Sequence, residues 1–389
     1  MDNVLDYLDW RGDLSLQQCP FGPVDSLVLC CLTYLRFEEL PGERPLQLRE
    51  AAGQFFNLPP ERQKARTPQD FTLLQKAADS RRFSGMLLTR CRSEFIPEEE
   101  KQFAAMTFLP EDGSVYLAFR GTDSSLVGWK EDFNMSFLDT VPSQLAAARY
   151  LQEAAECFSG PIRLGGHSKG GNLAVYAASQ AGPELLPRIL CVYNNDGPGF
   201  GPGTAGSTGY RMVLPLVQTF LPQSSVVGML LEHDEPYTVV RSGQVSLLQH
   251  DPYSWQVRGR DFVRMEEVTA GSRFVDQTLK SWVAEMDLSQ REIFFDTVFQ
   301  GCSAPGARSF ADVAGAWLRR PALLKENLEK LSPEQRRIVR RTVSMLLSAG
   351  GRSLQELLRR RQDEGENVLP AESEPVLLPE KRADSPKND

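Results

Sequence analysis

Short apolar runs alternate with amphipathic helical patterns through the middle of the chain. The runs are rich in Val, Leu, Phe and Tyr, which favours buried strands, and the segments between them repeat apolar residues at helical spacing. Strand-like runs lie at 86–88, 102–108, 115–120, 161–164 and 189–193, and helix-like segments at 26–35, 71–81, 144–158 and 172–180. Asp112-Gly113 is a hairpin signal. This order predicts an α/β protein with a doubly wound, mostly parallel sheet whose first strands are antiparallel.

Further apolar runs follow the glycine-rich segment at 197–209. Residues 210–221 have helical spacing and predict a helix, whereas 226–231, 246–248 and 253–257 predict strands. Because the segment 197–222 joins a glycine-rich half to an apolar, helix-like half, it is a candidate lid or, equally, a plain surface insertion. Residues 1–20 are predicted to form an N-terminal arm, and the whole of 1–288 one domain.

The pattern changes near residue 289. Ser289-x-x-Glu292 and Ser332-Pro333-x-Gln335 are capping-box starts, the second with proline at the first helical position. They predict a C-terminal helical extension over 289–361. The remaining residues, 362–389, are charged and proline-bearing and predict a disordered tail.

Composition narrows the class of protein. The chain of 389 residues carries a net charge of −8, which argues against non-specific binding of nucleic acid. No signal peptide or membrane-spanning run is evident in the sequence, and the seven scattered cysteines lack metal-ligand spacing. We therefore expect a cytoplasmic protein with reduced thiols and without a metal or organic cofactor.

One motif carries chemistry. Ser168 lies in Gly166-His167-Ser168-Lys169-Gly170, between a predicted strand and a predicted helix. Strand, tight turn and helix is the context of the nucleophile elbow of serine hydrolases, where glycines allow the close approach of neighbouring backbone. The alternative is a glycine-rich turn that binds a phosphate or nothing.

A serine nucleophile needs a base, and the chain has only three histidines. His167 is adjacent to Ser168, so its side chain is expected to point away from the hydroxyl and to bond within the turn region. His250 follows a predicted strand and is the preferred base, with His233 less suitable because only Asp196 precedes it as an acid. His250 could also be an ordinary turn residue before Asp251-Pro252.

The acid should lie between the serine and the histidine in the chain. Asp234 follows the predicted strand at 226–231 and is preferred, and Asp196, after the strand at 189–193, is the alternative. Asp234 could equally be a solvated carboxylate in a polar turn. For the oxyanion hole, the backbone N–H of Lys169 and a donor from Thr122, at the end of the strand 115–120, are the candidates.

These segments resemble a known family. VYLAFRGT at 115–122, WKEDF at 129–133 and the GHSKGG elbow are similar to class 3, or fungal-type, lipases. LDYLDWRGDLS near the N-terminus, NNDGPGF and SSVVGMLLEHDEP resemble an uncharacterised bacterial family of α/β-hydrolase-like proteins, over roughly residues 3–260. The resemblance implies an α/β-hydrolase fold with Ser168 as nucleophile, Asp234 as acid, His250 as base and Thr122 as oxyanion residue.

The sequence departs from the lipase pattern at Lys169, after the nucleophile, and at the turn 194–199. These departures argue against a long-chain triglyceride substrate. The leading hypothesis is a serine carboxylic ester hydrolase that acts on a small-molecule or lipid ester, with amide hydrolysis or acyl transfer by the same residues as variants. The alternative is a non-catalytic module of the same fold that binds a lipid or a protein.

Overall fold

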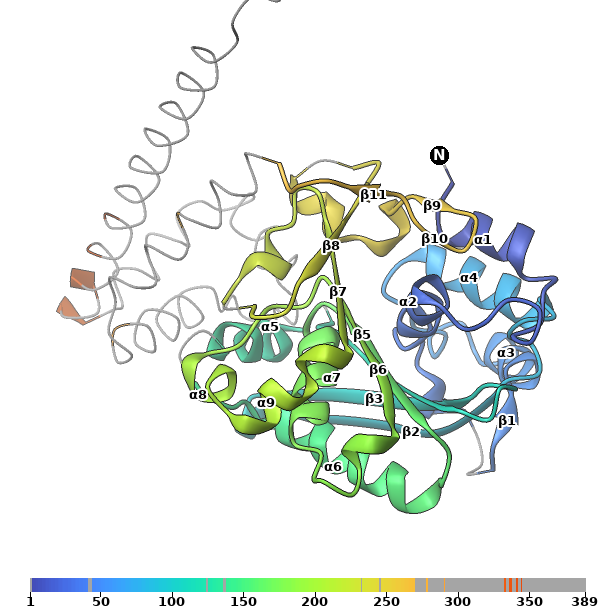
Figure 1. The fold of residues 1–389 in the computed structure, drawn as a ribbon, viewed down its shortest axis with the longest axis horizontal. Helices are drawn as coiled ribbons and strands as arrows, with labels where there is room; N and C mark the ends of the chain where they lie inside the picture. Colours follow the sequence, from blue (N-terminus) through green and yellow to red (C-terminus); the bar gives the residue numbers. More distant parts are fainter. Residues whose placement is uncertain are drawn as a thin grey trace, which may run out of the picture.

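A nine-stranded mixed sheet forms the centre of the molecule (Figure 1). The computed structural model describes residues 2–40, 44–123, 125–135, 138–231, 233–244 and 246–269, with isolated positions beyond. The strand order is β1-β2-β3-β4-β5-β6-β7-β8-β11, and β9 and β10 form a separate hairpin. The strands are β1 (Leu46–Gln47), β2 (Leu87–Ile96), β3 (Lys101–Leu109), β4 (Val115–Phe119), β5 (Ile162–His167), β6 (Ile189–Asn195), β7 (Val217–Pro222), β8 (Tyr237–Val240), β9 (Val257–Arg258), β10 (Asp261–Phe262) and β11 (Arg264–Met265).

The five central strands, β4 to β8, are parallel, and the strands at both edges are antiparallel. The antiparallel start and the hairpin between β3 and β4 are as the sequence predicts. The sheet is mixed rather than mostly parallel, since half of its pairings are antiparallel. Within the parallel part, each strand lies beside the strand before it in the sequence, so the chain crosses the sheet in one direction.

Helices cover both faces, but they come from different parts of the chain. Right-handed crossovers that all step in one direction place their helices on the same face. This face carries α6 (Pro142–Cys157), α7 (Lys169–Ser179) and α9 (Thr208–Val213), with α5 (Leu126–Asn134) and α8 (Pro202–Ala205) nearby (Figure 1). The prediction of a doubly wound sheet is therefore wrong, because the strand order never reverses.

The opposite face is covered by the N-terminal helices α1 (Val4–Arg11), α2 (Pro23–Leu32), α3 (Leu48–Phe56) and α4 (Pro68–Asp79). Strand β4 shows the two layers directly. Val115, Leu117 and Phe119 pack among α6 and α7, while Tyr116 and Ala118 pack among α1 to α4. The N-terminal segment, which the sequence predicts to be an arm packed on the domain, is part of this layer, because α1 buries Val4 and Tyr7.

A buried ion pair holds the N-terminal layer together. The guanidinium of Arg82 donates to both carboxylate oxygens of Asp25 at 2.6 Å, and both side chains are essentially inaccessible. Tyr7 donates a third hydrogen bond to this carboxylate, and Arg82 also reaches the carbonyl of Cys19. The pair thus ties α1, α2 and the turn after α4 to one another.

The segment 197–222 is not an independent flap. The predicted helix at 210–221 is wrong, because α9 ends at Val213 and β7 begins at Val217. Pro215 lies between them, and proline has no N–H with which to continue a helix. Strand β7 is an interior strand between β6 and β8, and Tyr210 of α9 is fully buried, so neither can be lifted away as the lid that the sequence suggested.

The predicted strands at 226–231, 246–248 and 253–257 are also wrong in large part. Residues 227–229, 246–250 and 252–254 form single 3₁₀ turns, and only Val257 of the last run begins a strand. The helical extension at 289–361 and the tail at 362–389 lie outside the described residues, apart from isolated positions.

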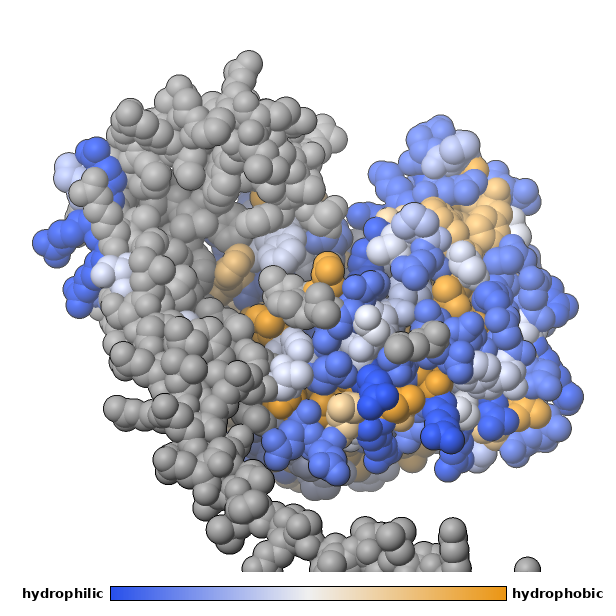
Figure 2. All heavy atoms as spheres, turned by 90° about the horizontal axis from the view of Figure 1, so that it is seen from above, coloured by the Kyte–Doolittle hydropathy of each residue, from blue (hydrophilic) through white to orange (hydrophobic). Residues whose placement is uncertain are grey.

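The described surface is mostly polar, with small apolar groups between hydrophilic residues on the face seen in Figure 2. Within the described ranges, no helix has the length and apolar character needed to cross a bilayer. The six cysteines that lie in this part of the chain are all unpaired thiols.

Replacing Arg82 with Met should lower the free energy of unfolding by about 3–5 kcal/mol, because the Asp25 carboxylate would stay buried without its partner. Arg264→Met is the matched control, since Arg264 pairs with Asp261 at the surface. It should cost less than about 1 kcal/mol. Urea denaturation of both variants measures the difference, and equal losses would contradict the assignment of Arg82 as a structural anchor.

Candidate active site

Ser168 occupies a strained turn between β5 and α7, as its motif predicts. Its backbone dihedrals are φ 60° and ψ −135°, a region that residues other than glycine rarely adopt. A Cβ on Gly166 would lie 2.0 Å from the carbonyl carbon of Gly170, and one on Gly170 would lie 2.1 Å from the oxygen of Phe119. Both glycines are therefore required for β4, β5 and α7 to approach one another.

His250 connects Ser168 to a carboxylate. Its Nε2 lies 2.9 Å from the Ser168 hydroxyl, and its Nδ1 lies 2.6 Å from Oδ2 of Asp196. The His250 side chain is 25% exposed, whereas Asp196 is fully buried. The serine, imidazole and carboxylate thus form an unbroken hydrogen-bonded chain that reaches the protein surface at the imidazole.

Asp196 follows β6 directly and has a left-handed backbone conformation, with φ 54°. Its second oxygen, Oδ1, accepts hydrogen bonds from the Ser225 hydroxyl and, at 3.2 Å, from the N–H of Gly228. These hydrogen bonds fix the orientation of the buried carboxylate beside the imidazole.

Asp234 is not the partner of His250, which corrects the sequence-based preference. The residue is exposed, and the carboxylate at His250 belongs to Asp196. The preference depended on a strand at 226–231, and that segment is a 3₁₀ turn instead. The imidazole that bonds to Ser168 is that of His250 and not that of His233, whose Nδ1 bonds to the buried Glu235 at 3.0 Å.

His167 lies behind the pair rather than facing the serine, as expected. Its Nε2 is 2.8 Å from the backbone carbonyl of His250, and its Nδ1 is 3.0 Å from the hydroxyl of Tyr34. A carbonyl only accepts, so Nε2 must carry the proton. Burial, reinforced by the neighbouring His250, holds the pKa of His167 well below its ordinary value, so Nδ1 is free to accept from Tyr34. His167 thereby ties the backbone of His250 to the elbow, a role that sequence reasoning did not find.

The predicted oxyanion donors lie on both sides of the nucleophile. Lys169 is the first residue of α7, where N–H groups have no partner within the helix. On the other side, a Cβ on Gly121 would lie 3.1 Å from the Cβ of Ser168, which places the loop of Thr122 against the serine. The Thr122 hydroxyl donates to Oδ2 of Asp132 at 2.5 Å, so it is engaged with that carboxylate.

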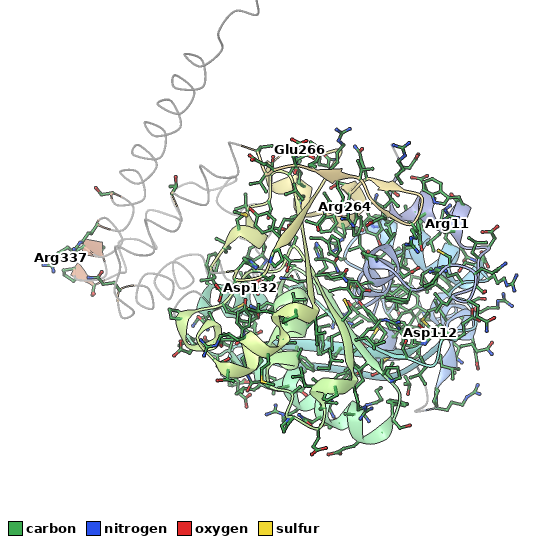
Figure 3. The ribbon with its side chains drawn as sticks, viewed as in Figure 1. Arg11, Asp112, Asp132, Arg264, Glu266 and Arg337 are labelled. Carbon is green, nitrogen blue, oxygen red and sulfur yellow. The ribbon has the colours of Figure 1, made fainter. Side chains whose placement is uncertain are left out.

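The side chain of Lys169 does not line the open side of the site. Its ammonium is buried and bonds to Gln102 and to Glu131 on α5. Asp132, the next residue of that helix (Figure 3), has a pKa raised by burial to about 6, against the opposing effects of Lys169 and Thr122. Sequence reasoning did not find these contacts, because they join residues far apart in the chain.

Within the described residues, no group of His, Cys, Asp and Glu side chains is arranged to hold a metal ion. The functional groups that the structure does bring together are a hydroxyl, an imidazole and a carboxylate. Such a set can perform nucleophilic and general acid–base chemistry with its own atoms.

No curated protein matches the sequence. Two lipases of known structure are similar to the chain. The Rhizomucor miehei lipase propeptide complex is 18% identical, the match covers 53% of this chain and 67% of the lipase chain, and the TM-score is 0.34. M37 lipase is 14% identical, the match covers 53% of this chain and 69% of the M37 lipase chain, and the TM-score is 0.35. The Mbeg1-like family matches residues 77–300, which are more than half of the chain and include Ser168, Asp196 and His250. The protein therefore belongs to that family.

Proposed function

We propose that the protein is a serine hydrolase of carboxylic esters, with an α/β-hydrolase type of fold. The observation that carries the proposal is the hydrogen-bonded chain from Asp196 through His250 to Ser168, on a strained elbow. Strain of this kind persists where the surrounding structure enforces it, and it is concentrated at functional sites.

In the first half of the reaction, the Ser168 hydroxyl oxygen attacks the acyl carbon as its proton passes to Nε2 of His250. The carbonyl π bond breaks, and the negative charge on its oxygen is stabilised by the N–H groups of Lys169 and Thr122. Asp196 accepts the hydrogen bond from Nδ1 and stabilises the imidazolium. The tetrahedral adduct then collapses, the C–O bond to the leaving group breaks, and His250 returns its proton to the departing alcohol.

In the second half, a water molecule attacks the acyl-enzyme. His250 takes one water proton, the oxyanion forms again, and collapse releases the carboxylic acid while Ser168 recovers its proton. No metal or organic cofactor takes part in either half. The substrate is a small-molecule or lipid ester.

A fluorophosphonate probe should label the protein at Ser168, and p-nitrophenyl acyl esters of several chain lengths should be hydrolysed. Ser168→Ala should remove both the label and the turnover, because no other hydroxyl contacts the imidazole of His250 within the described residues. Intact-mass spectrometry and an absorbance assay measure the two effects. Absence of labelling and of serine-dependent turnover would favour the alternative, a non-catalytic module that binds a lipid or a protein.

Asp196→Asn and Asp234→Asn distinguish the two candidate acids. Asp196→Asn should lower kcat by about 10³–10⁴-fold, since an amide would favour the wrong imidazole tautomer and would not stabilise the imidazolium. Asp234→Asn should leave kcat within about twofold of the wild type, given the exposed position of that side chain. A large loss on changing Asp234, with activity retained on changing Asp196, would reverse the assignment.

The neutral state of His167 predicts a pH dependence of stability. The pKa of His167 is lower in the folded protein than in the unfolded chain, where it is about 6.5. Below that pH the unfolded chain binds a proton that the folded protein excludes, so stability is present above pH 6.5 and is lost as the pH falls.

Denaturation midpoints measured from pH 7.5 to pH 5 should reveal this effect. The wild type should lose about 1.4 kcal/mol more per pH unit than His167→Asn below pH 6.5, while other titrating groups contribute equally to both proteins. Parallel curves for the two proteins would contradict a neutral, buried His167.

A further inference from the structure

The ammonium group of Lys169 lies at the junction of three elements. Lys169 begins α7, and its Nζ donates to the carbonyl of Gln102 at 2.8 Å, to Oε1 of Gln102 at 2.9 Å and to Oε2 of Glu131 at 2.8 Å. The Lys169 side chain is 1% exposed and that of Glu131 is inaccessible. All three ammonium protons are therefore used inside the protein, and the group is too deeply buried to contact a substrate.

Glu131 extends this junction to a fourth element. Its Oε2 accepts from the N–H of Gln102 at 3.0 Å and from the Ser143 hydroxyl at 2.8 Å, and its Oε1 accepts from the N–H of Ser143 at 2.8 Å. One carboxylate on α5 thus joins β3, α6 and α7. Each of these bonds is made to a charged group in a buried setting, where such bonds are strongest.

The next residue of the same helix reaches the active site. Asp132 accepts the hydrogen bond from Thr122 through Oδ2, while its Oδ1 is buried, has no hydrogen-bond partner and lies 4.0 Å from Nζ of Lys169. The position of Thr122 therefore depends on Asp132, and that of Asp132 on how α5 is seated. The seat of α5 in turn depends on the pair between Glu131 and Lys169.

We propose that Lys169 is a positioning residue which, through Glu131 and α5, holds the Thr122 loop in the geometry that binds the oxyanion. This inference rests on the proposed function. One residue would then serve both sides of the nucleophile, since its N–H is one oxyanion donor and its side chain places the other. A Lys directly after the nucleophilic serine is accordingly a feature of the scaffold of the site and not of its substrate pocket.

Hydrogen–deuterium exchange tests the positioning directly and does not require activity. In Lys169→Met, amides in peptides covering residues 120–135 should exchange faster by about tenfold or more, while those of β6 and the N-terminal helices stay unchanged. Lys130→Met is the matched control, because it removes an ion pair from the same helix, to Glu100, on the exposed side. It should leave exchange over 120–135 unchanged.

Kinetics provides the second readout. Lys169→Met and Glu131→Gln should each lower kcat for a p-nitrophenyl ester by about 10²-fold, the effect of losing one oxyanion donor, with KM within threefold of the wild type. The double variant should be no worse than either single variant, because both changes release the same helix. Lys130→Met should keep the wild-type kcat.

The outcomes separate the two claims. Unchanged exchange over 120–135 in both Lys169→Met and Glu131→Gln would overturn the positioning role, as would faster exchange spread evenly over the whole protein. If the wild type shows Ser168-dependent turnover and both variants keep the wild-type kcat, the positioning role is also overturned, while the proposed function stays intact. A wild type without such turnover refutes the proposed function, and the positioning of residues 120–135 by Lys169 is then decided by exchange alone.

Discussion

The close approach of β4, β5 and α7 around Ser168 is the constraint on which the rest of the structure depends. Backbone contacts fill the space where side chains on Gly166 and Gly170 would lie, and they leave Ser168 in a conformation that an isolated chain would avoid. Such a turn is stable only when both flanking elements are fixed. The buried layers on the two faces of the sheet provide that fixation, through α6 and α7 on one side and α2 on the other.

The simple order of the sheet brings the functional groups together. Because β4 to β8 are parallel and adjacent in sequence, their carboxyl ends meet at one edge. Thr122 follows β4, Ser168 follows β5 and Asp196 follows β6, so three consecutive strand ends supply the proposed oxyanion loop, the proposed nucleophile and the carboxylate. His250 arrives from a later turn and is held there by His167, which lies next to the serine in the chain.

Local sequence patterns predict the elbow, its strand and its helix, and the scarcity of histidine leads to His250. They fail where a decision depends on distant contacts. Asp196 and Asp234 both follow apolar runs, but the run before Asp234 is a turn, and Pro215 converts an expected helix into α9 and the interior strand β7. The same limit applies to Lys169, which in the sequence argues against a long-chain triglyceride substrate, whereas in the fold its ammonium is paired with Glu131.

The hydrogen bond between Nδ1 of His250 and Asp196 is the contact on which the proposed triad depends. Proton NMR at low temperature observes this ring N–H directly, because a short bond to a carboxylate moves its resonance far downfield. We expect one such resonance in the wild type, absent from the spectra of His250→Gln and Asp196→Asn and present in that of Asp234→Asn. A resonance assigned to His250 that survives in Asp196→Asn, or disappears in Asp234→Asn, would contradict this expectation.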